Sequence, residues 1–220
     1  MSEIYESDQD QVEKIKKWWA ENGRSTVIGL VVGLSSVFGW ASWQTHQIAQ
    51  TEAASALYTL IESAAENKKF ANVEERAQTL LAEFPDSGYA SLATFYRAKA
   101  AMEAGRADAH KAHLQWIFDN AKETEYRDIA RLRLARIALD GGDSAKALGL
   151  LDGVKTNQEY QGVIDALRGD IAVSKGDTEG ARKAYTNAVD ALGANTPQGI
   201  RTQLLLDDLG SLNVPGSPGA

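Results

Sequence analysis

The chain has 220 residues, a net charge of −7 at pH 7, three histidines and no cysteine. The absence of cysteine excludes zinc ribbons, thiol nucleophiles and disulfides, so the folded part must be stabilised by packing. Outside residues 1–24 there are 19 basic and 24 acidic residues with no basic stripe. This distribution argues against nucleic acid and anionic lipid headgroups as ligands.

Residues 1–24 predict a charged tail that contains a short amphipathic helix over 9–21, where apolar positions recur at three- and four-residue spacing. Asn22-Gly23 predicts the end of this helix, because both residues tolerate a left-handed backbone. The tail contains four Lys or Arg residues, and none follows until Lys68. The positive-inside rule therefore places residues 1–24 in the cytoplasm and everything after about residue 46 on the far side of the membrane.

Residues 25–46 predict a transmembrane helix, because the stretch from Ser25 to Thr51 contains no Lys, Arg, Asp or Glu. At a rise of ~1.5 Å per residue, about 32 Å separates the tryptophans that flank the span, close to the ~30 Å thickness of the hydrocarbon core. The residues expected at the two membrane interfaces are Trp18, Trp19, Trp40 and Trp43. The long acidic leader and the absence of a small-residue cleavage site argue against a cleaved signal peptide.

Small residues within the span form a candidate helix-pairing surface. Gly29 and Gly33 have the GxxxG spacing, and Ser36 is expected on the same side. Such residues let the backbone of a second helix approach closely. Because small residues are frequent in any membrane helix, the alternative that this face has no specific partner stays open.

Residues 47–212 predict one all-α domain built from internal repeats. Gly142-Asp143 recurs as Gly176-Asp177 at an offset of 34 residues, and an alanine follows five residues after each glycine. This period and this spacing across the turn are typical of tetratricopeptide repeats. A third, looser copy contains Gly105, after which the register is expected to slip because His110 replaces the alanine.

A fourth copy, from Ala54 to about Ser87, carries Lys68 in place of the glycine. Gln198 to Leu209, entered through Pro197, predicts a helix that caps the last repeat. The predicted fold class is therefore all-α: a single transmembrane helix, a tetratricopeptide-like α-solenoid of about four helix pairs, and a capping helix. Residues 213–220 are expected to be disordered.

Residues with catalytic potential are few. His110 and His113 could share a metal ion, but no third ligand stands at a natural spacing, so a metal-dependent hydrolase is a remote alternative to a solvated helix surface. The adjacent carboxylates Glu74-Glu75 and Asp207-Asp208 diverge by about 100° on a helix and are expected to be solvated. The sequence therefore predicts no enzyme, no cofactor and no metal.

A solenoid of helix pairs instead predicts an interaction protein, because its first helices line a groove that accepts extended peptides or a partner helix. In the repeat register, the residues expected in this partner groove are Leu92, Phe95, Lys99, Met102, Ile129, Leu132, Arg136, Leu139 and Asp170. Apolar residues dominate this set, which suits varied hydrophobic segments rather than one charged motif. The alternative, that these residues pack internally or against the helix leaving the membrane, stays open.

Four segments resemble the bacterial YfgM family of ancillary SecYEG translocon subunits: MSEIYESDQDQVEKIKKWWAENG, GWASWQTHQ, LRLARIALDGGDSAKALGLLD and LRGDIAVSKGDTEGARKAYTNAV. The resemblance runs from residue 1 to about residue 212, and the C-terminal NVPGSPGA extends past it. It implies a single-pass inner-membrane protein that has its repeat domain in the periplasm and is bound to the Sec translocon and to the membrane-anchored periplasmic chaperone PpiD. It also implies no catalytic residues.

Two tasks follow from the resemblance. The family is expected to help transfer unfolded exported polypeptides to periplasmic chaperones, and its cytoplasmic tail is expected to restrain a stress-response regulator. An alternative in the same class is a scaffold for an envelope assembly complex, such as one for outer-membrane insertion or the cell wall.

Overall fold

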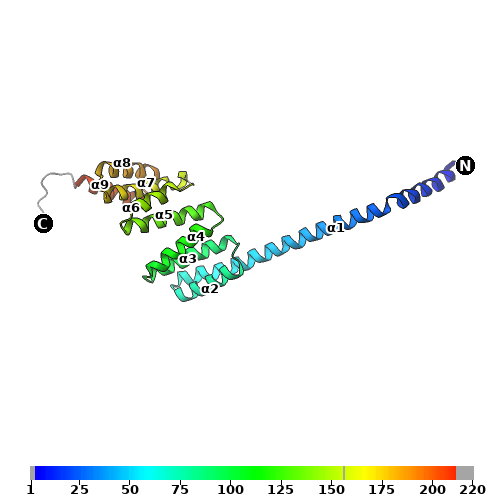
Figure 1. Ribbon diagram of the computed structural model, residues 1–220, viewed down its shortest axis with the longest axis horizontal. Helices are drawn as coiled ribbons and strands as arrows, with labels where there is room; N and C mark the ends of the chain where they lie inside the picture. The colour runs from blue at the N-terminus through cyan, green and yellow to red at the C-terminus, as the bar shows by residue number, and fades with distance from the viewer. Residues whose placement is uncertain (1–2, 156, 212–220) are drawn as a thin grey trace. The chain divides into compact units, whose positions relative to one another are not determined.

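The computed structural model describes residues 3–155 and 157–211, with side chains for 11–155 and 160–210, and this described part is helical without strands. Its helices are α1 (Glu3–Glu66), α2 (Phe70–Glu83), α3 (Gly88–Glu103), α4 (Ala107–Asn120), α5 (Thr124–Asp140), α6 (Ser144–Asp152), α7 (Asn157–Ser174), α8 (Thr178–Leu192) and α9 (Pro197–Ser211) (Figure 1). The predicted all-α class is confirmed. The disorder predicted for 213–220 concerns residues outside the described ones.

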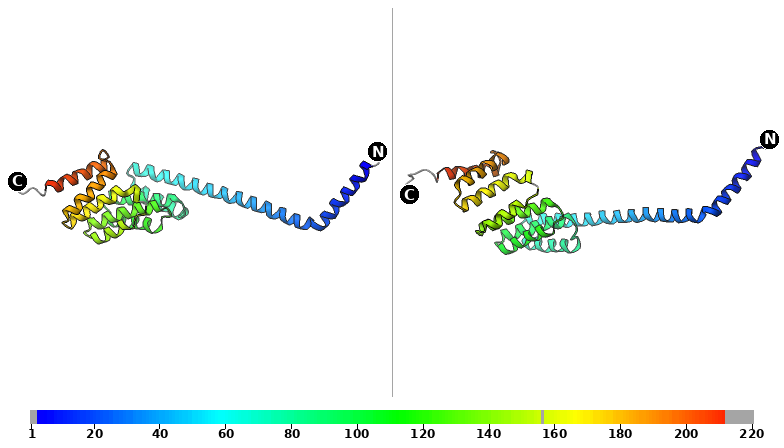
Figure 2. Two further views of the ribbon diagram at one scale, coloured as in Figure 1. Left: turned by 90° about the horizontal axis from the view of Figure 1, so that it is seen from above. Right: turned by 45° about the horizontal axis from the view of Figure 1, so that its top comes forward.

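The chain divides into two compact units, residues 1–53 and 54–220. In the first unit α1 continues through Asn22-Gly23 as one helix, so the helix end predicted there is wrong. Figure 2 shows that the blue part of α1 bends instead. The polar groups there are satisfied within the helix: Asn22 donates from Nδ2 to the carbonyl of Trp18 at 3.2 Å, and Thr26 donates to the carbonyl of Asn22 at 3.0 Å. Gly23 leaves room for the ring of Trp19, so both residues fit inside a helix.

The second unit is a series of helix pairs, formed by the end of α1 with α2, by α3 with α4, by α5 with α6, and by α7 with α8. Successive core clusters join these pairs. Ile61 is buried between α1, α2 and α3, Leu114 between α3, α4 and α5, and Leu151 between α5, α6 and α7. Each cluster is shared with the next pair, as stacked repeats require, and the predicted solenoid of four helix pairs is confirmed.

The same turn ends the first helix of every pair. Its left-handed residue is, in chain order, Lys68 (φ 53°), Gly105 (φ 70°), Gly142 (φ 81°) and Gly176 (φ 73°). In the third pair Gly142 donates its N–H to Leu139 and Asp143 donates its N–H to Ala138, both at 2.8 Å. These two bonds form a Schellman motif, which glycine adopts without steric cost. The first repeat therefore has the same turn although it lacks the glycine.

The aspartate that follows two of these glycines begins the second helix. Asp143 accepts a hydrogen bond from the N–H of Lys146 at 2.9 Å, and Asp177 accepts one from the N–H of Gly180 at 2.9 Å. Each carboxylate thus satisfies a helix N–H that has no partner within the helix. The recurrence of Gly-Asp in the sequence has this local physical cause.

Lys68 offers a direct test of the turn. Its replacement by glycine should raise the free energy of unfolding by about 0.5–1 kcal/mol, because relief of the left-handed strain exceeds the added freedom of the unfolded chain. Urea unfolding of the full-length chain in detergent micelles, followed by circular dichroism, measures this change. Lys69→Gly is the matched control, since Lys69 has φ −84°, and an equal gain from both variants would contradict the prediction.

The register does not slip after Gly105, contrary to the prediction. The second helix begins two residues after the glycine at Ala107, at Ser144 and at Thr178. His110 occupies the helix-crossing position that alanine holds in the next two repeats. Its Nδ1 lies 2.8 Å from the carbonyl oxygen of Ala98 on α3, so the larger polar ring is accommodated by a hydrogen bond.

The capping helix is confirmed as α9. Its first turn is fixed by Thr196, whose Oγ1 accepts a hydrogen bond from the N–H of Gly199 at 3.0 Å. Leu209 is buried against Ala181 and Tyr185 of α8. The helix therefore covers the apolar side of the last pair.

Candidate functional site

Within the described residues, α1 is the helix that is long and apolar enough to cross a membrane, judged by length and composition, and its apolar window is not covered by other parts of the chain. The tryptophans predicted at the interfaces are all at least half exposed: Trp18, Trp19, Trp40 and Trp43. They form two neighbouring pairs, with ring centroids 6.3 Å apart in the first pair and 5.1 Å apart in the second. Their location at membrane interfaces stays a prediction.

The small residues of the span present an open surface. A Cβ atom added at Gly29 or Gly33 would meet nothing within 4 Å. The hydroxyl of Ser36 donates to the carbonyl of Val32 in its own helix at 2.8 Å. Ser36 therefore contributes small size to this face, because its hydroxyl is already bonded. Pairing with a partner helix stays a prediction.

The predicted groove residues lie on α3, α5 and α7, and the repeat register extends their surface to neighbouring helices. Phe95 and Leu132 correspond to Tyr58 on α1, to Ala166 on α7 and to Ile200 on α9. Four residues further along each helix stand Glu62, Lys99, Arg136, Asp170 and Leu204. We call this surface, together with the other predicted groove residues, the first-helix face.

Exposure separates the nine predicted groove residues. Lys99 and Met102 are exposed, Met102 by 57%. Six are half-buried: Leu92, Phe95, Ile129, Arg136, Leu139 and Asp170. The prediction for Leu132 is wrong, since it is 7% exposed and belongs to the core cluster with Ile164 and Leu167. The Leu132 side chain is buried because α7 packs against α5.

Aromatic contacts cover the part of the first-helix face nearest α1. The rings of Tyr58 and Tyr96 lie 5.8 Å apart, and Phe95 meets Tyr126 of α5 edge to face at 6.2 Å. The guanidinium of Arg133 lies 4.8 Å from the centre of the Phe95 ring, a cation–π contact. Phe95 is therefore packed between helices. Neither Tyr126 nor Arg133 was predicted as a partner of Phe95.

Two of the three charged groove residues, Arg136 and Asp170, bind each other. Nη1 of Arg136 forms an ion pair with Oδ2 of Asp170, and the hydroxyl of Tyr185 donates to Oδ1 of Asp170 at 2.6 Å. Burial, followed by the hydrogen bond to the Asp170 carboxylate, raises the pKa of Tyr185. Both carboxylate oxygens of Asp170 thus have donors from α5 and α8.

A pocket with a volume of about 200 Å³ opens beside this ion pair, between α5, α7 and α9. Its lining residues are Arg136, Val163, Ala166, Asp170, Leu192, Gln198, Arg201, Thr202 and Leu205. Sequence reasoning missed it because α9 was interpreted only as a cap. The register could have indicated it, since Ala166 is much smaller than Phe95 or Leu132 at the same position.

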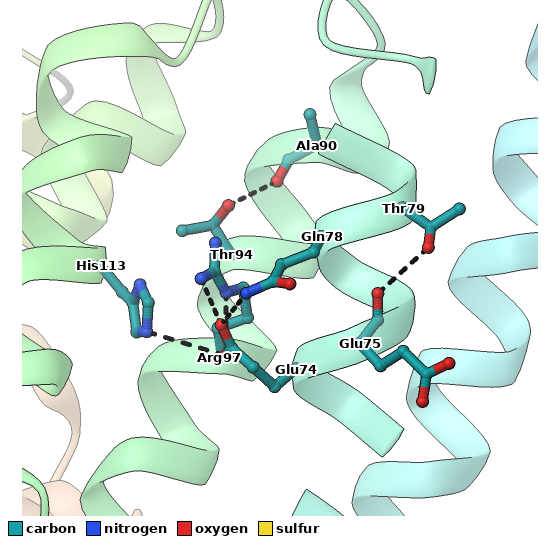
Figure 3. A network of polar contacts seen from close by, with 8 residues as sticks. All are labelled: Glu74, Glu75, Gln78, Thr79, Ala90, Thr94, Arg97 and His113. Carbon is teal, nitrogen blue, oxygen red and sulfur yellow. Dashed lines mark hydrogen bonds and ion pairs between the residues drawn. The ribbon is translucent and has the colours of Figure 1, made fainter. Parts of the chain in front are cut away.

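A second polar network joins α2, α3 and α4 (Figure 3). Nε of Arg97 donates to Oε2 of Glu74 at 3.0 Å, a second guanidinium nitrogen pairs with Oε1, and Gln78 donates to Oε1 at 2.9 Å. The hydrogen bond from Arg97 lowers the pKa of the Glu74 carboxyl. The prediction that Glu74 is solvated is wrong, because its side chain is 28% exposed and paired.

The side chains of His110 and His113 are half-buried and point toward neighbouring helices. The prediction that they lie on a solvated helix surface is therefore also wrong. His110 contacts the backbone of α3, and Nε2 of His113 lies 4.0 Å from Oε2 of Glu74. Burial lowers the pKa of His113. Among the described side chains, no group of three or more His, Cys, Asp or Glu is placed to hold a metal ion.

Stacked helix pairs with left-handed turns and buried alanines at the helix crossings define a tetratricopeptide-type repeat protein. A family model described as a tetratricopeptide repeat-like domain matches residues 16–211. Three bacterial relatives are each named Ancillary SecYEG translocon subunit. The one from Escherichia coli K12 is 30% identical over 187 residues, which cover 85% of this chain and 89% of the relative.

The relative from Haemophilus influenzae is 32% identical over 184 residues, 82% of this chain and 88% of its own length. The relative from Aggregatibacter actinomycetemcomitans is 30% identical over 197 residues, 90% of this chain and 96% of its own length. The chain belongs to the family of ancillary SecYEG translocon subunits. No solved structure shows significant similarity to it.

Proposed function

We propose that this chain is a non-enzymatic, membrane-anchored interaction protein that associates with the Sec translocon. The observation that carries this proposal is its similarity to relatives named as ancillary SecYEG translocon subunits, over 82–90% of this chain. The architecture supports it. The uncovered apolar segment of α1 supplies an anchor, and the repeat domain supplies an interaction surface.

The proposed orientation has residues 1–24 in the cytoplasm, a single span in the bacterial inner membrane, and the repeat domain in the periplasm. Lys and Arg flank only the N-terminal side of the span, as the positive-inside rule requires. In this arrangement the open face at Gly29 and Gly33 pairs with a helix of the translocon.

The first-helix face is the proposed contact surface for unfolded exported polypeptides. Met102, Ile200 and Leu204 lie on it and are 57%, 51% and 64% exposed. Exposed apolar side chains, and flexible methionine above all, adapt to varied hydrophobic segments. The function that follows is transfer of these segments to a membrane-anchored periplasmic chaperone of the PpiD type.

A cytoplasmic role is proposed on the resemblance alone, namely that residues 1–24 restrain a stress-response regulator. The competing function is a scaffold for an envelope assembly complex, which would use the same repeats. The two differ in one observable, because a scaffold would not copurify with translocon subunits.

Photocrosslinking in intact membranes tests the main proposal. On a helix with about 3.6 residues per turn, Val32 lies beside the Gly29–Gly33 face and Val31 points away from it. A photoreactive amino acid at Val32, but not at Val31, should crosslink a translocon subunit. One at Met102 or Leu204 should crosslink exported polypeptides, whereas one at Lys183, exposed on α8, should not.

Absence of translocon subunits from every adduct and from material purified in mild detergent would refute the association and favour the scaffold. Equal crosslinking from Lys183 and from Met102 would refute the role of the first-helix face. The two parts of the proposal can therefore fail separately.

A further inference from the structure

The capping helix aligns in the repeat register with the first helices of the four pairs. Gly210 follows Gly176 by 34 residues, the interval that separates Gly176 from Gly142. Ile200 and Leu204 therefore hold the register of Ala166 and Asp170 on α7. They extend the first-helix face onto α9, where both side chains are more than half exposed.

The pocket between α5, α7 and α9 arises from a small residue in this register. Phe95 fills the corresponding position on α3, where Arg133 of the next first helix lies over its ring. Arg201 has the register of Arg133, but the residue beneath it is Ala166, and both residues line the pocket. The space that a large side chain fills in the second unit is therefore empty in the fourth.

The polar groups of this pocket leave hydrogen-bond donors in excess. Asp170 already accepts from Arg136 and from Tyr185. Arg136 uses one of its five N–H groups for that bond, and its side chain is still 43% exposed. Arg201 is exposed, and no ion pair to it occurs among the described side chains. The guanidinium groups of Arg136 and Arg201 thus line a pocket in which the carboxylate of Asp170 already accepts hydrogen bonds.

Two more features favour an anionic group with apolar neighbours. The pocket borders the first turn of α9 at Gln198, where the helix dipole favours negative charge. Apart from Thr202, whose hydroxyl donates to the carbonyl of Gln198 at 2.9 Å, its remaining wall is apolar, from Val163, Ala166, Leu192 and Leu205. A volume of about 200 Å³ accommodates one side chain or one chain terminus rather than a large ligand.

We propose that this pocket binds a carboxylate group carried by an apolar polypeptide segment. The carboxylate lies between Arg136 and Arg201, since guanidinium groups bind carboxylates with well-defined geometry. The apolar residues beside it lie on Ile200 and Leu204. This inference rests on the proposed function, and it names the chemistry that the first-helix face recognises at its α9 end.

Fluorescence anisotropy with three labelled decapeptides tests the site on the full-length chain in detergent micelles. Two peptides share one Leu- and Ala-rich sequence, and one of these has a free C-terminal carboxylate while the other is amidated. The third peptide is amidated and differs from them by a central glutamate. A carboxylate peptide should bind about ten-fold more tightly than the neutral amide, as one charge-assisted contact provides. The two charged peptides distinguish a chain terminus from an acidic side chain.

Variants assign the effect to the pocket. Arg201→Gln should remove most of the ten-fold preference and leave the affinity for the neutral amide unchanged. Ala166→Phe, which introduces the residue found at position 95, should fill the pocket and weaken both charged peptides. Ala166→Leu serves the same purpose if the phenylalanine variant loses helicity. Lys183→Gln, an equal change of charge on α8, should have no effect.

Equal binding of all three peptides, or an unchanged preference in Arg201→Gln, would overturn the carboxylate site. Such a result combined with continued crosslinking of polypeptides from Met102 and Leu204 would refute only the pocket. Loss of those crosslinks would refute the proposed function itself.

Discussion

Replacing Arg97 with methionine should lower the free energy of unfolding by about 3 kcal/mol at pH 7. The substitution removes both guanidinium contacts to Glu74 and leaves that carboxylate only 28% exposed and without its cation. Loss of one partner of a largely buried pair costs about 3–5 kcal/mol, and the lower limit applies because both groups retain some contact with water. Urea unfolding of the full-length chain in detergent micelles measures the change.

The pH dependence of this loss checks its cause. Arg97 lowers the pKa of Glu74 from its ordinary value of 4.5. The pair therefore contributes stability above pH 4.5, and the contribution disappears as the pH falls through the lower pKa of the folded state. The difference between wild type and Arg97→Met should be largest at neutral pH and shrink below pH 4.5.

A matched control is the exposed pair of Lys122 and Asp86, whose side chains are 64% and 90% exposed. Lys122→Met should change the free energy of unfolding far less than Arg97→Met does, because solvent-exposed ion pairs contribute little. Comparable losses from Arg97→Met and Lys122→Met would contradict the importance of burial. A loss from Arg97→Met that is independent of pH would point to lost packing of the arginine stem.

Gly169→Ala should lower the free energy of unfolding by about 2 kcal/mol, although alanine is normally the better helix former. A Cβ atom at Gly169 would overlap the ring of Tyr185 on α8. Overpacking of this kind costs about 1–3 kcal/mol, more than the ~0.5–1 kcal/mol that alanine contributes within a helix. Urea unfolding, as for the Arg97 variant, provides the measurement.

The preceding repeat indicates which second substitution should compensate. There Ala135 and Leu151 occupy the positions of Gly169 and Tyr185, and both are buried. Gly169→Ala combined with Tyr185→Leu should therefore be more stable than the sum of the two single changes predicts, because the smaller side chain makes room for the new methyl group. Additive losses would show that the two positions are not coupled.

Gly149 is the control for helix propensity in this series. It lies exposed in α6, and a Cβ atom there would meet nothing within 4 Å. Gly149→Ala should stabilise the chain by about 0.5–1 kcal/mol. Destabilisation of similar size at both glycines would show that contact with Tyr185 is not the cause of the loss at Gly169.

The repeats were predictable because their turns depend on local chemistry. A left-handed glycine, an aspartate that caps the next helix and a small residue at the helix crossing are each visible within six residues, as in Gly142 to Ala147. The copy from Ala54 to about Ser87 was predicted although it lacks the glycine, and Lys68 adopts the same left-handed backbone there. Local signals failed at Asn22-Gly23, where neighbouring residues of one helix satisfy the polar groups.

The sequence by itself determined the all-α class, the period of the solenoid and the position of the apolar span, because each follows from backbone preferences and from hydrophobicity along the chain. Only the tertiary structure decided that Leu132 is buried, that Glu74 is paired, and that Arg136 and Arg201 border one pocket. These outcomes depend on the distance between helices that are remote in sequence. Burial and charge pairing are therefore settled by packing.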